Sequence, residues 1–118
     1  MDLTKMVDFH FLGIVFILMH EMDAIRCKEW RIFPGLSFLN DKAGLIVFIF
    51  VHVPLFYWIL LEIQLNDEKF TYGFDYFLML HFILHLLFLI HKKNEFKDWI
   101  SWTIISGAAL FGFLDLMI

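Results

Sequence analysis

Four histidines lie inside long apolar stretches of this sequence, where ionisable side chains are rare and usually functional. Their positions are His20, His52, His81 and His85. Glu21 and Asp23 follow the first of them within one helical turn, and the last two are four residues apart. Residues four apart share one side of a helix, so both rings of that pair face the same way. Imidazole together with carboxylate is typical ligand chemistry for zinc or iron.

These histidines are predicted to lie at a similar depth in a membrane. At about 1.5 Å per residue, each is roughly 13 to 20 Å from a membrane face. A charged group at that depth is costly, and a cation would offset much of the cost because it pairs carboxylates and keeps imidazoles neutral. The sequence therefore predicts a buried divalent metal site with Glu21 as the candidate catalytic base. The predicted metal ligands are His20, Asp23, His52, His81 and His85.

Zinc is favoured over iron as the ion. Di-iron helix bundles typically use four glutamates and two histidines, which is more carboxylate than this chain places near its histidines. Three other interpretations stay open at this stage. The histidines and carboxylates could form a proton relay, two of the histidines could hold a haem, or the polar side chains could simply hydrogen-bond the helices together.

The elements that must position these residues are membrane helices. The chain has 118 residues, 61% of them apolar, and a mean hydropathy of +0.76, which is too apolar for a small soluble domain. Four segments stand out, at residues 7–31, 43–63, 73–91 and 98–117. A helix needs roughly 20 residues to cross the hydrocarbon, and the first segment reaches that length only if its polar second half continues the helix. The short connections predict one all-α domain over residues 1–118, a four-helix transmembrane bundle with up-down antiparallel topology.

Basic residues predict the orientation of this bundle. The first and third connections carry seven lysines or arginines, against two on the opposite side. The seven are Arg26, Lys28, Arg31, Lys42, Lys92, Lys93 and Lys97, and the two are Lys5 and Lys69. This places both termini on the non-cytoplasmic side of an inner (cytoplasmic) membrane that the chain crosses several times. The net charge of −4 argues against a nucleic-acid partner.

Polar residues near the segment ends are expected to have no buried role. His10 lies at the start of the first segment and is expected to be solvated. Asp75 and Asp115 are near the outer face and are expected at the interface with water. Glu29 is expected at the cytoplasmic interface, where Arg31 would bind a lipid phosphate or pair with a nearby carboxylate.

Several strings resemble those of an uncharacterised family of small bacterial membrane proteins, a domain of unknown function of about this length. They are His20-Glu21-Met22-Asp23-Ala24, Glu29-Trp30-Arg31, His52-Val53-Pro54-Leu55 and His81-Phe82-Ile83-Leu84-His85. The first string is also similar to membrane proteins named for a His-x-x-Glu-Glu motif, although Asp23 and Ala24 stand where that motif has its two glutamates. The resemblance implies a multi-span fold and no particular activity.

Two functions follow from these residues. The first is an intramembrane metalloenzyme acting on a lipid, with zinc activating water for hydrolysis or iron supporting oxidation. The second is a non-enzymatic membrane subunit that binds a partner protein, or a homo-oligomer that conducts protons or metal ions. A four-helix chain has little room for a substrate cavity, which favours the second function.

Overall fold

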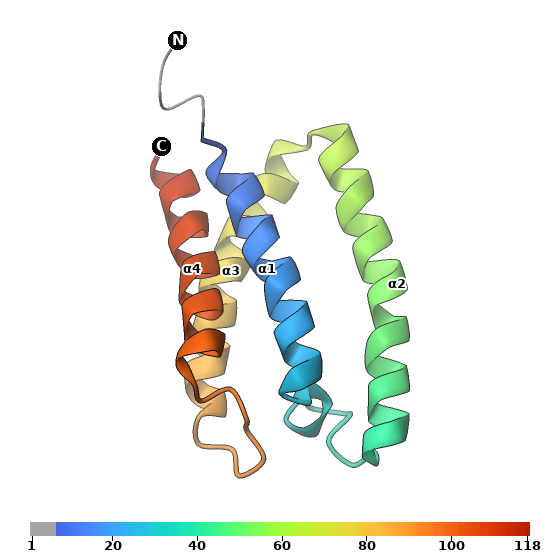
Figure 1. The fold of residues 1–118 in the computed structure, drawn as a ribbon. Coiled ribbons are helices and arrows are strands. Elements are labelled where there is room, and N and C mark those ends of the chain that lie inside the picture. Colours follow the sequence, from blue (N-terminus) through green and yellow to red (C-terminus); the bar gives the residue numbers. More distant parts are fainter. Residues whose placement is uncertain (1–6) are drawn as a thin grey trace.

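The computed structural model describes residues 7–118, which form an all-helical chain without strands (Figure 1). The elements are α1 (Phe9–Arg26), the short 3₁₀ turn η2 (Glu29–Arg31), α2 (Asp41–Leu65), α3 (Glu68–Phe88) and α4 (Trp99–Met117). The prediction of an all-α chain with four long helices is confirmed. The first helix is shorter than predicted and the third begins earlier, directly after the cap residue Asp67.

Three of the four long helices, α2, α3 and α4, are long and apolar enough to cross a membrane, which indicates a membrane protein. Helix α1 has eighteen residues but carries Glu21, Asp23 and Arg26 in its second half, so its composition alone does not mark it as a span. A fourth crossing therefore stays a prediction. The outward side chains of α2 are apolar, with Phe50 67% and Leu60 65% exposed, as expected for a helix that faces lipid.

A polar side chain begins every long helix. Asp8, Asn40, Asp67 and Asp98 each accept a hydrogen bond from a backbone N–H of the first turn. Such caps satisfy amide groups that have no partner within the helix, and they fix where each helix starts.

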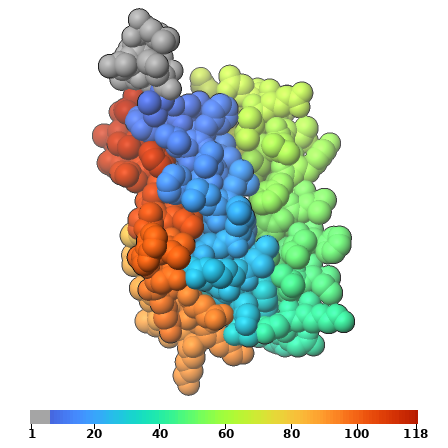
Figure 2. All heavy atoms as spheres, in the orientation of Figure 1, coloured from blue at the N-terminus to red at the C-terminus, as the bar shows by residue number. Residues whose placement is uncertain are grey.

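Helices α1, α3 and α4 pack together, with α4 against both of the others, whereas α2 stands to one side and makes its main contact with η2 (Figure 1). In the space-filling view α1 lies between α4 and α2 (Figure 2). Gly112 allows the close approach of α3 and α4, because a Cβ there would lie 2.9 Å from the backbone oxygen of Asp75. The bundle is therefore three tightly packed helices with a fourth alongside.

The basic connections gather at one end of the bundle. The connections α1–α2 and α3–α4 lie together at that end, and the start of α1, the end of α4 and the α2–α3 turn lie at the other (Figure 1). Lys5, one of the two basic residues predicted on the opposite side, lies outside the described residues. Which end faces the cytoplasm stays a prediction.

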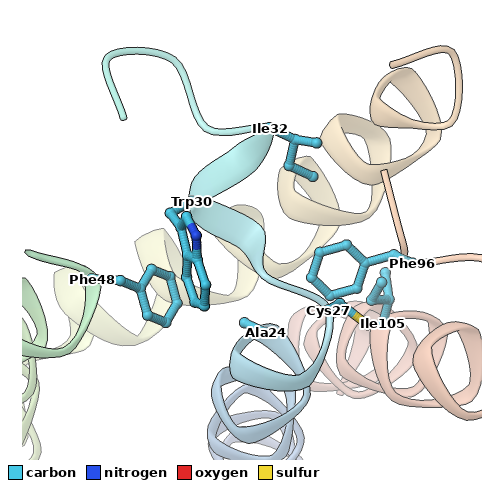
Figure 3. Packing of buried hydrophobic residues seen from close by; sticks show 7 residues of the cluster. All are labelled: Ala24, Cys27, Trp30, Ile32, Phe48, Phe96 and Ile105. Carbon is cyan, nitrogen blue, oxygen red and sulfur yellow. The ribbon is translucent and has the colours of Figure 1, made fainter. Parts of the chain in front are cut away.

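Two apolar clusters fill the interior at different heights. The cluster nearer the chain ends contains Ile14, Ile17, Phe70, Phe74, Leu78 and Ala108. The cluster at the basic end contains Ala24, Cys27, Trp30, Ile32, Phe48, Phe96 and Ile105 (Figure 3). Three of the four predicted histidines follow the first cluster along α1 and α3, because His20 lies between Ile17 and Ala24, and His81 and His85 come after Leu78. The polar groups thus lie in an apolar interior that excludes water.

Candidate metal centre

Three histidines from two helices meet in the interior of the bundle. His20 comes from α1, and His81 and His85 come from successive turns of α3. Their ring centroids are 4.3 Å (His20–His81), 4.8 Å (His20–His85) and 4.5 Å (His81–His85) apart, and each pair of rings is steeply inclined. One ring nitrogen from each lies within 4.8 Å of the others, so the group could hold a metal ion.

These rings are buried and lack hydrogen-bond partners. His20 and His85 are 1% exposed and His81 is 8% exposed. Within residues 7–118 no hydrogen-bond partner exists for Nδ1 of any of the three, nor for Nε2 of His85. A buried polar atom without a partner costs about 1–3 kcal/mol, so native proteins rarely leave several at one point. One nitrogen from each of the three rings can face a shared ligand, so the group could hold a metal ion.

Phe96 closes this centre from the side of the α3–α4 connection. Its ring stacks on His20 at a centroid distance of 5.4 Å and meets His85 edge-on at 4.6 Å. The backbone of Phe96 is fixed on both sides, because its N–H donates to Asn94 Oδ1 at 3.2 Å and its carbonyl accepts from Trp102 Nε1 at 2.9 Å. Phe96 is completely buried, so the histidine rings are shielded from water at that end.

Glu29 is a further candidate ligand that the sequence prediction placed elsewhere. Lys28 has a left-handed backbone conformation (φ 53°), which turns the chain back after α1 and brings η2 beneath the end of that helix. The carboxylate Oε2 of Glu29 lies 3.3 Å from His20 Nε2, and the residue is 8% exposed. Glu29 is therefore buried, contrary to the expectation that it has no buried role, whereas its position at a membrane interface stays a prediction. The prediction that Arg31 pairs with a nearby carboxylate is confirmed, since Arg31 donates to Asp41.

The structure does not bring Asp23 into the histidine group. Its carboxylate accepts from Arg26 Nε at 2.7 Å and from Ser101 Oγ at 2.6 Å. Asp23 comes three residues after His20, and at about 100° per residue the two side chains lie roughly 60° apart around the helix axis. That angle is small on a helical wheel, but it is enough to direct the carboxylate towards α4 while the imidazole faces α3.

His52 also lies apart from the histidine group. Its Nε2 is 2.5 Å from Glu21 Oε2, and its Nδ1 is 2.5 Å from the carbonyl oxygen of Phe48. The reason is the position of α2, which does not pack closely on α3. The predicted base and one predicted ligand are therefore partners of each other in a separate carboxylate–imidazole pair.

A second group of potential ligands lies at the other end of the bundle. His10, Asp75 and Asp115 come from α1, α3 and α4, and each offers a ligand atom within 4.8 Å of the others. Asp75 is completely buried, contrary to the expectation that it has no buried role, whereas its depth relative to a membrane stays a prediction. The close approach of the helices at Gly112 carries this part of α3 into the interior.

The histidine group has the donor chemistry of a metal site. Zinc accepts imidazole nitrogens and carboxylate oxygens, and here three imidazoles lie together with the Glu29 carboxylate next to one of them, His20. Catalytic zinc sites typically use three protein ligands and leave one position for water or substrate. If Glu29 bound an ion held by the three histidines, protein ligands would fill all four positions, as in a structural zinc site. If Glu29 only oriented the His20 ring, one position would stay open, as in a catalytic zinc site.

Comparison with protein-family models identifies the family of this chain. A family model described as a family of unknown function (DUF6713) matches residues 6–118. The chain belongs to this family. The predicted resemblance to an uncharacterised family of about 120 residues is thereby confirmed, whereas the quoted strings as family motifs and the bacterial origin stay predictions. Comparisons with curated proteins and with solved structures found no match.

Proposed function

We propose that this chain is an intramembrane protein that binds a divalent metal ion between His20, His81 and His85. Glu29 serves as a fourth ligand or as the group that orients His20. The observation that carries the proposal is a group of three buried histidines, each with a ring nitrogen that has no hydrogen-bond partner among the described residues and each offering a ligand atom within 4.8 Å of the others. Zinc fits best, because imidazole is a good zinc ligand and only one carboxylate is adjacent.

The geometry favours a metal over the other interpretations of the histidines. The three rings touch one another edge-on, which leaves no flat slot between them for a haem. A proton relay along the three rings would require hydrogen bonds between them, and none connects them in residues 7–118. An ion satisfies all three rings at once and keeps them neutral in a dry interior.

We also propose that α1 is a fourth membrane crossing and that the basic end of the bundle faces the cytoplasm. Eighteen residues give a length of about 27 Å, close to the thickness of the hydrocarbon. The ionisable residues of α1 that would be costly in lipid have partners, since Glu21 contacts His52 and Asp23 contacts Arg26. The concentration of Lys and Arg at one end supports the orientation.

The metal content of the purified protein tests the metal proposal. The full chain would be purified in detergent, stripped with a chelator, reloaded with Zn²⁺ and measured by mass spectrometry of the element. We expect His81→Ala and His85→Ala each to lose one zinc equivalent relative to the wild type. The matched control is His91→Ala, an exposed histidine just beyond α3, which should keep it. Zinc content unchanged in the α3 variants, or lost equally in the control, would overturn the proposal.

A second candidate function is hydrolysis of a lipid, and the cavities beside Glu21 favour it. A cavity of about 530 Å³, lined mostly by apolar side chains of α2 and α3, has Glu21 on its wall. A neighbouring cavity of about 480 Å³ is bordered by both Glu21 and His52. Apolar cavities of this size suit a lipid chain. A bound ion would supply Lewis-acid chemistry, and Glu21, oriented by His52, would take a proton from water.

The Glu21→Gln variant separates this candidate from a non-enzymatic subunit. Release of fatty acid from phospholipid in mixed micelles, followed by mass spectrometry, would report hydrolysis. The lipid-hydrolase candidate predicts that the variant loses this activity and keeps its zinc. If the zinc-loaded wild type releases no fatty acid, the non-enzymatic interpretation is supported instead, and the metal proposal is unaffected.

A further inference from the structure

We propose that His10, Asp75 and Asp115 form a second metal site, for an oxygen-preferring divalent cation such as Mn²⁺, at the end of the bundle opposite the histidine centre. One ligand comes from each of α1, α3 and α4. Their ligand atoms lie within 4.8 Å of one another, and His10 Nδ1 is 3.6 Å from Asp75 Oδ1. The three tightly packed helices therefore converge on this point.

The burial of Asp75 is the observation that indicates a ligand. Its side chain is 0% exposed, and neither carboxylate oxygen has a hydrogen-bond partner in the described part of the chain. The Nδ1 atom of His10 is likewise buried and without a hydrogen bond there. A buried carboxylate without hydrogen bonds is strongly unfavourable, whereas a cation placed between these groups would satisfy both. Exposed acidic residues do not by themselves indicate a cation site, whereas a buried carboxylate without a hydrogen-bond partner does.

Neighbouring residues hold the two ends of the site in place. Phe70 and Phe74 meet the His10 ring edge-on, at centroid distances of 6.2 Å and 5.7 Å. Gly112 lets α4 approach the backbone of Asp75, and Asp115 follows three residues later on the same side of α4. The positions of the ligands thus follow from helix packing rather than from flexible loops, which is typical of functional sites.

A cavity borders two of the three ligands of this site. It has a volume of about 220 Å³ and is bordered by His10 and Asp115 together with Asp8, Glu62 and Asn66. The further acidic residues at its border would attract a cation and repel an anion. Asn66, in the α2–α3 turn, lines this cavity, so the cavity lies at that end of the bundle, and an ion could approach His10 and Asp115 from it.

The ligand chemistry differs from that of the histidine centre. Two carboxylates and one imidazole form an oxygen-rich set that suits Mn²⁺, whereas three imidazoles favour Zn²⁺. The two sites are also separate, because His10 and His20 are ten residues apart on α1, about 15 Å along its axis. Ile14, Ile17 and Leu78 fill the interior between them. Each site can therefore be emptied without removing a ligand of the other.

Electron paramagnetic resonance of Mn²⁺ added to the metal-free full chain in detergent tests this proposal. We expect the wild type to bind one Mn²⁺ per chain. Asp75→Asn and Asp115→Asn should each weaken Mn²⁺ binding at least tenfold. Asp115 is less buried than Asp75, so the Asp115→Asn variant still tests the site if Asp75→Asn fails to fold. Glu68→Gln is the matched control, because Glu68 is an exposed acidic residue at the start of α3 outside the cavity lining, and this variant should bind Mn²⁺ normally. The His81→Ala variant should also keep its Mn²⁺, which separates this site from the histidine centre.

Two results would overturn the second site. One is a wild-type chain that binds no Mn²⁺, in which case the two carboxyl groups share a proton instead of an ion. The other is Mn²⁺ binding that disappears with His81→Ala and survives both aspartate substitutions. Neither result bears on zinc at the histidine centre, which is measured with Zn²⁺ and with different variants.

Discussion

Gly44 lies directly against the Trp30 ring, and its substitution by alanine should destabilise the fold. A Cβ at position 44 would lie 2.3 Å from Trp30 Cδ1 and 2.7 Å from Cγ. Carbon atoms in contact stay about 3.5–4.0 Å apart, so the indole would have to move by about 1 Å or more. Trp30 is 3% exposed, packs against Phe48 in the cluster at the basic end (Figure 3), and donates from Nε1 to Asp41 at 3.1 Å.

The size of the effect follows from three terms. Overpacking a well-packed core costs about 1–3 kcal/mol. Weakening the Trp30–Asp41 hydrogen bond costs about 0.5–1.5 kcal/mol more. Alanine has a higher helix propensity than glycine, which returns up to about 1 kcal/mol. The expected net loss for Gly44→Ala is therefore about 0.5–4.5 kcal/mol in the free energy of unfolding.

Gly73→Ala is the matched control, because it makes the same chemical change where there is space. A Cβ at position 73 would have no neighbouring atom within 4 Å among residues 7–118, its own helix aside. Unfolding in detergent micelles titrated with sodium dodecyl sulfate measures both variants. We expect Gly44→Ala to unfold at a lower fraction of dodecyl sulfate than the wild type, and Gly73→Ala to be equally or more stable. Equal stability of the two variants would refute the packing argument.

Three further predictions address the site and its surroundings. Glu29→Gln should weaken Zn²⁺ binding about 10–100-fold, as measured by competition with a chelating dye, because the residue contacts His20; an unchanged affinity would exclude Glu29 from the site. His52→Ala should leave the zinc affinity within about threefold of the wild type, because His52 pairs with Glu21 outside the centre; loss of zinc would mean that α2 moves onto the centre. Arg26 donates to Asp98 and holds the pKa of that carboxyl below its ordinary value of 3.8. The pair therefore stabilises the fold above about pH 4, and this stabilisation is lost as the pH falls through the pKa of Asp98 in the folded protein. Dodecyl sulfate unfolding at several pH values should show a flatter acid limb for Asp98→Asn, and identical pH profiles would contradict the argument.

The helices could be predicted from the sequence because their signals are local. Apolar length identifies the spanning segments, and polar residues such as Asn40 mark where helices begin. The spacing of His81 and His85 alone places both rings on one side of α3. The structure adds His20 to them, as predicted from its depth in the first segment.

The remaining contacts depend on which helices touch, and similar depth in a membrane does not determine that. His52 lies on α2, which stands apart from α3, so it reaches Glu21 instead of the other histidines. Asp23 differs from His20 by a small angle, but that angle directs it to a different helix. No pattern in the sequence distinguishes these outcomes.

Glu29 and Asp75 were misplaced for two different physical reasons. Glu29 reaches His20 only because Lys28 adopts a left-handed conformation, which is unusual for lysine and gives no sequence signal. Asp75 is buried because Gly112 lets two helices approach closely. The pair of small residues Ala108 and Gly112 predicts a close helix contact but does not identify the residues opposite it.

X-ray absorption at the zinc K-edge tests the central claim most directly, because it counts the atoms bound to the ion. The full chain, loaded with one equivalent of Zn²⁺ in detergent, should show three imidazole ligands and one oxygen at about 2.0–2.1 Å, with one imidazole fewer in His85→Ala. A zinc ion surrounded only by oxygen, one bound to sulfur from Cys27, or a spectrum identical in the His85→Ala variant would contradict the account.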